Sequence, residues 1–205
     1  MNAMTKPSEA AVDLAPLRDF VVGFGALVDG ARSERSILQS GAALLEALVA
    51  HDGWLPDAYA QPDPDRYRQY LLHCDSQERF SVVSFVWGPG QSTPVHDHRV
   101  WGLVGVLRGT ERVQRYARSD DGVLTPLGEP QLLHSGEVDG FGPETGDFHQ
   151  VANGRSDGPS VSIHVYGGNI GAVHRATYDE TGQEKPFVSG YSNDTLSNLW
   201  NRSIP

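Results

Sequence analysis

Three histidines in this chain have the spacing of a metal site. His96 and His98 are separated by a single residue, and His149 lies much further along the chain. On a β-strand, side chains two residues apart project from the same face, so His96 and His98 can contact one ion while Asp97 points the other way. Imidazole nitrogen binds iron, zinc, nickel and copper, so the histidines alone predict a metal centre and leave the metal open.

Glycines and prolines around the histidines indicate strands that are separated by tight turns. The first run has the pattern Gly90-(x)5-His96-x-His98-(x)3-Gly102-(x)6-Gly109, and the second has Gly136-(x)6-Pro143-(x)2-Gly146-(x)2-His149-(x)3-Asn153. We expect the third imidazole to come from a different hairpin than the first two. The alternative is structural, with the third histidine a hydrogen-bonded core residue and the first two exposed.

Four other histidines have no second ligand at strand spacing. We expect solvent contact or ordinary hydrogen bonding for these four: His51, His73, His134 and His174.

A second row of polar side chains lies in the segment SVSIHVYGG. Ser162, His164 and Tyr166 occupy alternate positions and therefore share one face of one expected strand. Such a row can pass a proton along, because the serine can orient the imidazole and the imidazole can hold a phenol at the metal cavity. The alternative places this face in solvent, with the intervening valines and isoleucine packing inward.

The elements that must position these residues change in type along the chain. From Pro16 to about His51, apolar residues recur at helical spacing, and Ser33 is placed to cap a helix. A segment rich in proline and aspartate follows and predicts a connecting loop. From Arg66 onward, short runs rich in Val, Phe, Tyr and Leu alternate with turn residues, which predicts a mainly β protein with an antiparallel barrel or sandwich.

The length of 205 residues suits a single domain with one closed core. Within it we expect a helical part over about 1–65, a barrel over about 66–180, and an irregular C-terminal tail over about 181–205 that covers the barrel.

The formal charge of −10 argues against nucleic acid and anionic membranes as partners, because both attract clustered Lys and Arg. No stretch approaches the roughly 20 apolar residues that span a bilayer. Cys74 is the only cysteine, so no disulfide can form within the chain, and the N-terminal residues lack the features of a secretion signal. We therefore expect a cytoplasmic enzyme, and the oligomeric state stays open.

The motifs HDHRVWG, DFHQV and S-x-H-x-Y together resemble those of a known family over most of the chain, from about Tyr67 to Tyr191. They are similar to the thiol dioxygenases, the cysteine dioxygenase type I group of the cupin superfamily, and VHDHRVWGLVGVLRG is most similar to the bacterial branch that includes 3-mercaptopropionate dioxygenase. The resemblance implies a double-stranded β-helix barrel with the helices packed on it. It also implies one Fe(II) per chain, bound by His96, His98 and His149, with Ser162, His164 and Tyr166 as an outer relay.

Two positions depart from the pattern of related proteins. Gly102 stands where the usual cupin motif has a glutamate and where the animal-type enzyme has the cysteine that is cross-linked to the relay tyrosine. Gln69 stands where the animal-type enzyme has an arginine that grips the substrate carboxylate. The resemblance to the bacterial enzymes makes Arg175 the candidate replacement, and a surface arginine is the alternative reading of that position.

These observations predict an iron-dependent thiol dioxygenase that adds both atoms of O2 to the sulfur of a small carboxylated thiol. In this hypothesis Gln69, Arg175 and Tyr166 bind the substrate. We favour 3-mercaptopropionate over L-cysteine, because a site without the animal-type arginine has less reason to select an amino acid. A zinc-dependent hydrolase or lyase and a non-catalytic cupin that binds a small acid stay open as alternatives.

Overall fold

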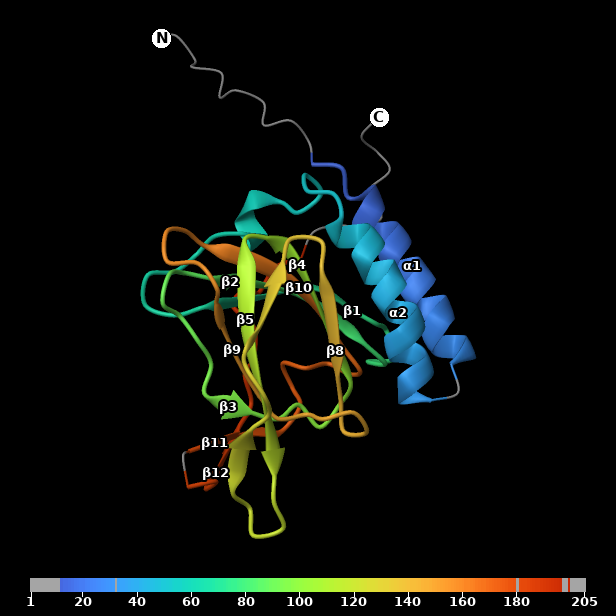
Figure 1. Cartoon of the computed structure of the whole chain (residues 1–205). Helices are drawn as coiled ribbons and strands as arrows, with labels where there is room; N and C mark the ends of the chain where they lie inside the picture. Colours follow the sequence, from blue (N-terminus) through green and yellow to red (C-terminus); the bar gives the residue numbers. More distant parts are fainter. Residues whose placement is uncertain (1–11, 32, 180, 197–198, 200–205) are drawn as a thin grey trace.

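The computed structural model describes residues 12–31, 33–179, 181–196 and 199. Two antiparallel sheets curl against each other to form a barrel, and two helices lie against the outer face of one sheet (Figure 1). This arrangement is the mainly β architecture that the sequence predicts, with its helices at the N-terminal end of the chain.

The two helices are α1 (Ala15–Gly30) and α2 (Glu34–Val49), followed by a short 3₁₀ turn, η1 (Asp57–Tyr59). Ser33 caps α2 as expected, and its side chain and that of Ser36 each accept a hydrogen bond from the other's backbone N–H. This reciprocal cap separates the predicted helical stretch into two antiparallel helices. α2 packs on the strands beneath it, and α1 packs on α2.

The first sheet supplies the wall of the barrel that the helices cover. In sheet order its five strands are β1 (Arg68–Cys74), β2 (Ser81–Trp87), β10 (Ser160–Tyr166), β4 (Gly102–Arg108) and β8 (Val138–Phe141). Every residue of β2 and β10 is buried, because one face of these strands meets the helices and the other faces the barrel interior. The main apolar core lies between this sheet and the helices.

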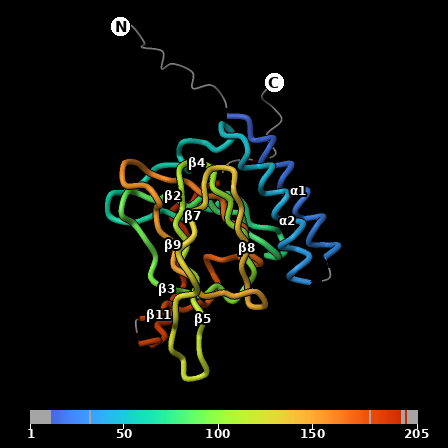
Figure 2. The backbone as a smooth tube through the Cα atoms, viewed as in Figure 1, coloured from blue at the N-terminus to red at the C-terminus, as the bar shows by residue number. Residues whose placement is uncertain are grey.

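The second sheet closes the other side of the barrel (Figure 2). Its strands are β12 (Glu184–Phe187), β11 (Arg175–Tyr178), β3 (Val95–His96), β9 (His149–Asn153), β5 (Thr110–Arg118) and β6 (Leu124–Pro126), with β7 (Gln131–His134) also paired to β5.

Two expectations about this second sheet need correction. The C-terminal stretch is not irregular throughout, because β12 forms a hairpin with β11 and extends the sheet. The first two ligand histidines do not share a strand, because β3 ends at His96 and His98 lies beyond it. Among the described residues, no helix combines the length and the apolarity needed to cross a membrane.

Candidate metal centre and its cavity

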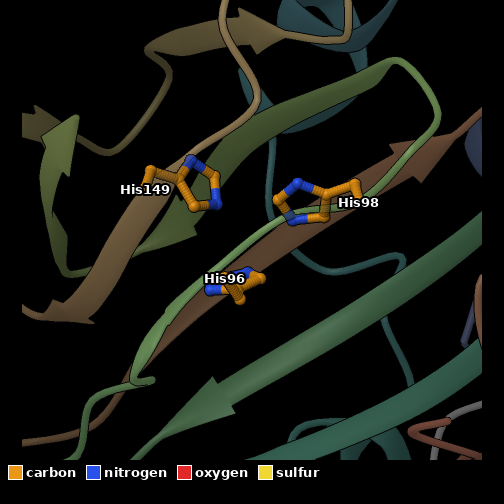
Figure 3. Close-up of side chains that lie close together, drawn as sticks. All are labelled: His96, His98 and His149. Carbon is orange, nitrogen blue, oxygen red and sulfur yellow. The ribbon is translucent and has the colours of Figure 1, made fainter. Parts of the chain in front are cut away.

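The three predicted ligand histidines meet inside the barrel (Figure 3). One nitrogen from each ring of His96, His98 and His149 lies within 4.8 Å of the others. His96 pairs directly with His149 across β3 and β9, which accounts for their approach. Asp97 points the other way, as expected, and accepts hydrogen bonds from the backbone N–H of Ala176 and the hydroxyl of Tyr178 on β11.

His98 reaches the centre through a turn that one carboxylate organises. The backbone N–H groups of His98 and Arg99 donate to Asp147, at 3.0 and 2.8 Å, and Nδ1 of His98 lies 2.9 Å from the same carboxylate. Arg99 has a φ of 61°, the left-handed conformation that turns the chain away after the ligand. The hydrogen bonds to Asp147, rather than strand pairing, therefore orient His98.

All three imidazoles are buried, with exposed fractions of 8%, 1% and 3% for His96, His98 and His149. The alternative that placed the first two in solvent is wrong. Burial lowers the pKa of His96 to about 4 and holds the pKa values of His98 and His149 well below the ordinary range. The rings are therefore neutral at physiological pH, which is the form that binds a metal.

The hydrogen bonds of the rings suit a metal ligand set. Nδ1 of His96 donates to the carbonyl of Pro94 at 3.1 Å, and Nδ1 of His98 donates to Asp147, so Nε2 of both rings is free to coordinate. Nδ1 of His149 is buried without a hydrogen-bond partner among the described residues. Three neutral imidazoles without a carboxylate ligand fit a divalent transition metal and leave its charge uncompensated.

The row on β10 faces the same interior. Oγ of Ser162 lies 2.8 Å from Nε2 of His164, and Nδ1 of His164 lies 2.9 Å from the hydroxyl of Tyr166. The ring of Tyr166 also stacks at 5.6 Å on the ring of His98. All three residues are buried, so the alternative that placed this face in solvent is wrong.

The residue opposite position 102 on the neighbouring strand β8 explains why a glycine stands at this position. It lies opposite Phe141 on β8 and opposite Tyr166 on β10. A Cβ atom at position 102 would lie 2.3 Å from the ring of Phe141, which means that Phe141 occupies the space a side chain there would need. The residue opposite Tyr166 on β4 is therefore a glycine, which has no thiol to offer the tyrosine.

Arg175 is buried rather than on the surface, with an exposed fraction of 4%. One of its terminal nitrogens donates to Oγ of Ser189 at 2.7 Å, its guanidinium lies over the ring of Phe187, and its Nε has no partner. Among the described residues, no carboxylate lies within salt-bridge distance of it. Burial lowers the pKa of Arg175, and the group remains a cation.

Gln69 lies in the same region, but its amide hydrogens are already used. Its Nε2 donates to Oγ of Ser189 at 2.9 Å and to the carbonyl of Gly190. Gln69 thus holds the segment that contacts Arg175. A direct contact of Gln69 with a substrate carboxylate stays a prediction.

One cavity of about 130 Å³ connects these groups. Its wall contains two of the three clustered histidines, His164 from the β10 row, and all three predicted substrate-binding residues. The lining residues are Tyr67, Gln69, Phe85, Trp87, Thr93, Pro94, His96, His149, Val151, His164, Tyr166, Arg175, Thr177, Phe187 and Ser189.

Sequence reasoning missed three polar residues around this cavity. Asp147 stands two residues before His149 in DFHQV, and that alternate spacing was a usable signal. Ser189 and the buried carboxylate of Glu111 carried no such signal, because their partners are distant in the sequence. The four other histidines lie outside the cluster, and His51, His134 and His174 are exposed, as expected.

The family model of cysteine dioxygenase type I matches residues 38–180. The chain belongs to the cysteine dioxygenase type I family. The match runs from within α2 to just beyond β11 and includes His96, His98, His149 and the β10 row. Membership supports thiol dioxygenase activity, and the expected mainly β barrel with N-terminal helices packed on it is confirmed by the structure.

More distant likenesses were also found. A protein from Thermus thermophilus is 21% identical, with 55% of this chain and 92% of that chain covered and a TM-score of 0.43. An uncharacterized Klebsiella pneumoniae protein with a double-stranded β-helix domain is 22% identical, with 56% and 89% covered and a TM-score of 0.41.

One curated protein shares a segment with this member of the family. Ribosomal protein uS12 methylthiotransferase RimO from Pelotomaculum thermopropionicum is 30% identical over 97 residues, which are 46% of this chain and 22% of that protein. The chain spans about a fifth of the length of this curated relative.

Proposed function

We propose that this protein is a non-haem Fe(II) thiol dioxygenase that converts a small carboxylated thiol into a sulfinate. The observation that carries the proposal is one cavity that brings together neutral, buried imidazoles and a buried guanidinium that has no carboxylate partner among the described residues. A divalent cation and Arg175 both favour an anionic ligand in a site of low dielectric constant. A thiol acid offers a thiolate to the cation and a carboxylate to Arg175.

The histidines would hold one iron per chain. When bound, ferrous iron lowers the pKa of a thiol ligand and holds thiol and O2 within reach of each other. The overall change is R–SH plus O2 to R–SO2H, in which the sulfur supplies the electrons and no external reductant is needed.

The residues of this chain orient the substrate and limit access of water. Arg175 would bind the carboxylate through its free N–H groups, while Ser189 and the ring of Phe187 hold the guanidinium in place. Tyr166 would hydrogen-bond the substrate, with its hydroxyl held by His164. Gln69 would support this arrangement through Ser189.

The cavity lining favours 3-mercaptopropionate over L-cysteine. Among its lining residues there is no aspartate or glutamate, so no carboxylate is available to pair with the α-ammonium group of cysteine. Burial of an ammonium group beside Arg175 and a metal ion would add like charges without compensation. An acid with a thiol and no amine meets no such penalty.

The substrate assignment is tested by steady-state kinetics with iron-loaded protein. We expect kcat/KM for 3-mercaptopropionate to exceed that for L-cysteine, with one O2 consumed per sulfinate formed. A strong preference for L-cysteine would reverse the substrate ranking and leave thiol dioxygenation intact. The same assay should include a panel of small thiols without a carboxylate, which we expect to react poorly.

Two other functions lead to different results. A zinc-dependent hydrolase or lyase would purify with zinc and act without O2, whereas a non-catalytic cupin would be stabilised by a small acid without consuming O2. The β10 row favours the dioxygenase, because neither alternative needs it. We further propose that the enzyme works in the cytoplasm on a freely diffusing thiol, without nucleic acid or membrane partners.

A further inference from the structure

Glu111 is a carboxylate buried inside the barrel, next to the β10 row but outside the cavity lining. It lies on β5, its exposed fraction is 0%, and its neighbour Arg112 faces solvent. Burial of a carboxylate is costly unless its oxygens are paired. Oε2 of Glu111 has no hydrogen-bond partner among the described residues, so this cost is only partly offset.

The other oxygen of Glu111 contacts the far end of the row. Nε1 of Trp87 donates to Oε1 of Glu111 at 2.8 Å, and it also lies 3.3 Å from Oγ of Ser162. Nε2 of His164 lies 3.7 Å from the same Oε1. Among the described residues, His164 is the one group capable of a positive charge within 4.0 Å of Glu111.

A neutral imidazole carries a hydrogen on one nitrogen and a lone pair on the other. In His164, Nε2 faces Glu111 and Ser162, and Nδ1 faces Tyr166. A negative charge beside Nε2 favours the hydrogen on that atom and disfavours a lone pair there, and the effect is strong at a buried site. Nδ1 is then the acceptor, and the hydroxyl of Tyr166 must donate to it.

We infer that Glu111 is a positioning residue that keeps a hydrogen on Nε2 of His164. The hydroxyl of Tyr166 then donates its hydrogen to Nδ1 of His164, and its oxygen acts as the hydrogen-bond acceptor towards a ligand in the cavity. Tyr166 can then accept from a group such as an incoming thiol, rather than donate to it. The catalytic consequence rests on the proposed function, whereas the proton position does not.

The test is nitrogen NMR on the full-length chain labelled with ¹⁵N-histidine and stripped of metal with a chelator, so that no open-shell ion broadens the signals. The His164→Gln spectrum assigns the His164 signals. In the unmodified protein we expect the shift of a hydrogen-bearing nitrogen at Nε2 and that of a lone-pair nitrogen at Nδ1. In Glu111→Gln we expect both shifts to move towards the opposite assignment, because the charge is gone.

The controls separate charge from packing. Glu129→Gln removes an equal charge from an exposed position and should leave the His164 signals unchanged. Glu111→Asp keeps the carboxylate and should restore the hydrogen on Nε2. If Glu111→Gln does not fold, Trp87→Phe offers a second test, since it removes the indole donor but keeps the charge and should keep Nε2 protonated.

Two results would overturn the inference: a hydrogen on Nδ1 of His164 in the unmodified protein, or unchanged shifts in folded Glu111→Gln. If the shifts move as expected but the unmodified, iron-loaded protein oxidises no thiol, the proposed function fails and this inference stands. With an active enzyme, Glu111→Gln should lower kcat more than it alters KM for the thiol, and Glu111→Asp should recover part of kcat.

Discussion

The two faces of β10 are equally buried and have opposite composition. Val161, Ile163 and Val165 pack into the apolar core beneath the helices, whereas Ser162, His164 and Tyr166 face the barrel interior. Burial therefore does not distinguish the residues that stabilise the fold from those that form the site. The distinction lies in what each face contacts, an apolar layer on one side and a hydrogen-bonded cavity on the other.

The two faces of β10 make contributions of opposite sign to the stability of the fold. A buried aliphatic side chain contributes about 1.5–3 kcal/mol through the hydrophobic effect. A buried polar group costs about 1–3 kcal/mol if it is unpaired, and the β10 row offsets this cost by pairing its members with one another. The helix-facing layer thus supplies stability that the cavity-facing row does not.

The largest expected effect comes from the cavity side. His149→Ala should abolish metal binding and activity, because only His96 and His98 would remain as ligands. Elemental analysis of the purified variant should show no bound ion, with the circular dichroism spectrum of the fold retained. His134→Ala, an exposed histidine on β7, is the matched control and should keep its metal. An iron-loaded, active His149→Ala protein would disprove the ligand assignment.

The opposite effect is expected on the helix side. Ile163→Ala removes a fully buried side chain from the apolar layer and should lower the free energy of unfolding by about 2–5 kcal/mol. Chemical denaturation measures this loss, and elemental analysis should show the metal still bound in the folded variant. Ile163→Val should cost only about 0.5–1.5 kcal/mol. Loss of metal at full stability would contradict the division between the two faces.

Tyr166→Phe tests the cavity face without removing a ligand. The variant should bind metal normally but show a fall in kcat of roughly 100-fold, in the range typical of a lost proton-handling group. Tyr70→Phe removes a hydroxyl that donates to the carbonyl of Gln61, its one partner in the described part of the chain, and should leave kcat unchanged. Unaltered turnover in Tyr166→Phe would remove the hydroxyl from the mechanism.

Arg175→Gln should weaken substrate binding and leave the metal in place. A hydrogen bond to a charged group is worth about 1.5–3 kcal/mol, which corresponds to a rise in KM of roughly 10- to 150-fold. Arg112→Gln removes the same charge from an exposed position on β5 as a control. Equal KM values for Arg175→Gln and the unmodified enzyme would show that the carboxylate binds elsewhere.

The smallest expected effect is a change in the pH dependence of stability, and it concerns the helix side of the molecule. The Arg79 guanidinium hydrogen-bonded to Asp75 holds the pKa of that carboxyl well below its usual range, and the same guanidinium contacts Asp29 of α1. Because the ionised form is favoured in the folded state, its stabilisation is present above pH about 4 and is lost as the pH falls through the lower, folded-state pKa. Asp75→Asn should therefore flatten the acid limb of the stability curve measured by thermal melting. If the acid limb of the stability curve is unchanged in Asp75→Asn, then groups other than Asp75 cause the loss of stability at low pH.

Local patterns in the sequence predicted much of the site. The spacing of Ser162, His164 and Tyr166 identified one face of one strand, and the glycine-framed motifs identified the three histidines that meet inside the barrel. The residues that were missed depend on long-range register. Phe141 explains Gly102 only because β8 pairs with β4, and Glu111 reaches His164 only across the barrel.

The same limit explains the errors in the fold. A strand was expected at His96 to His98, but β3 ends at His96, because Asp147 from a distant segment holds His98 in a turn. The pairing of β12 with β11 could not be predicted from local sequence either, because the sequence of Glu184–Phe187 has no strand pattern of its own.

The most direct test of the central claim uses ¹⁸O2 with iron-loaded protein and 3-mercaptopropionate. If three buried imidazoles and Arg175 assemble a thiol dioxygenase, mass spectrometry will show a sulfinate in which both oxygen atoms carry the label. Incorporation of label from water, or no sulfinate from any carboxylated thiol despite a full complement of iron, would contradict the account.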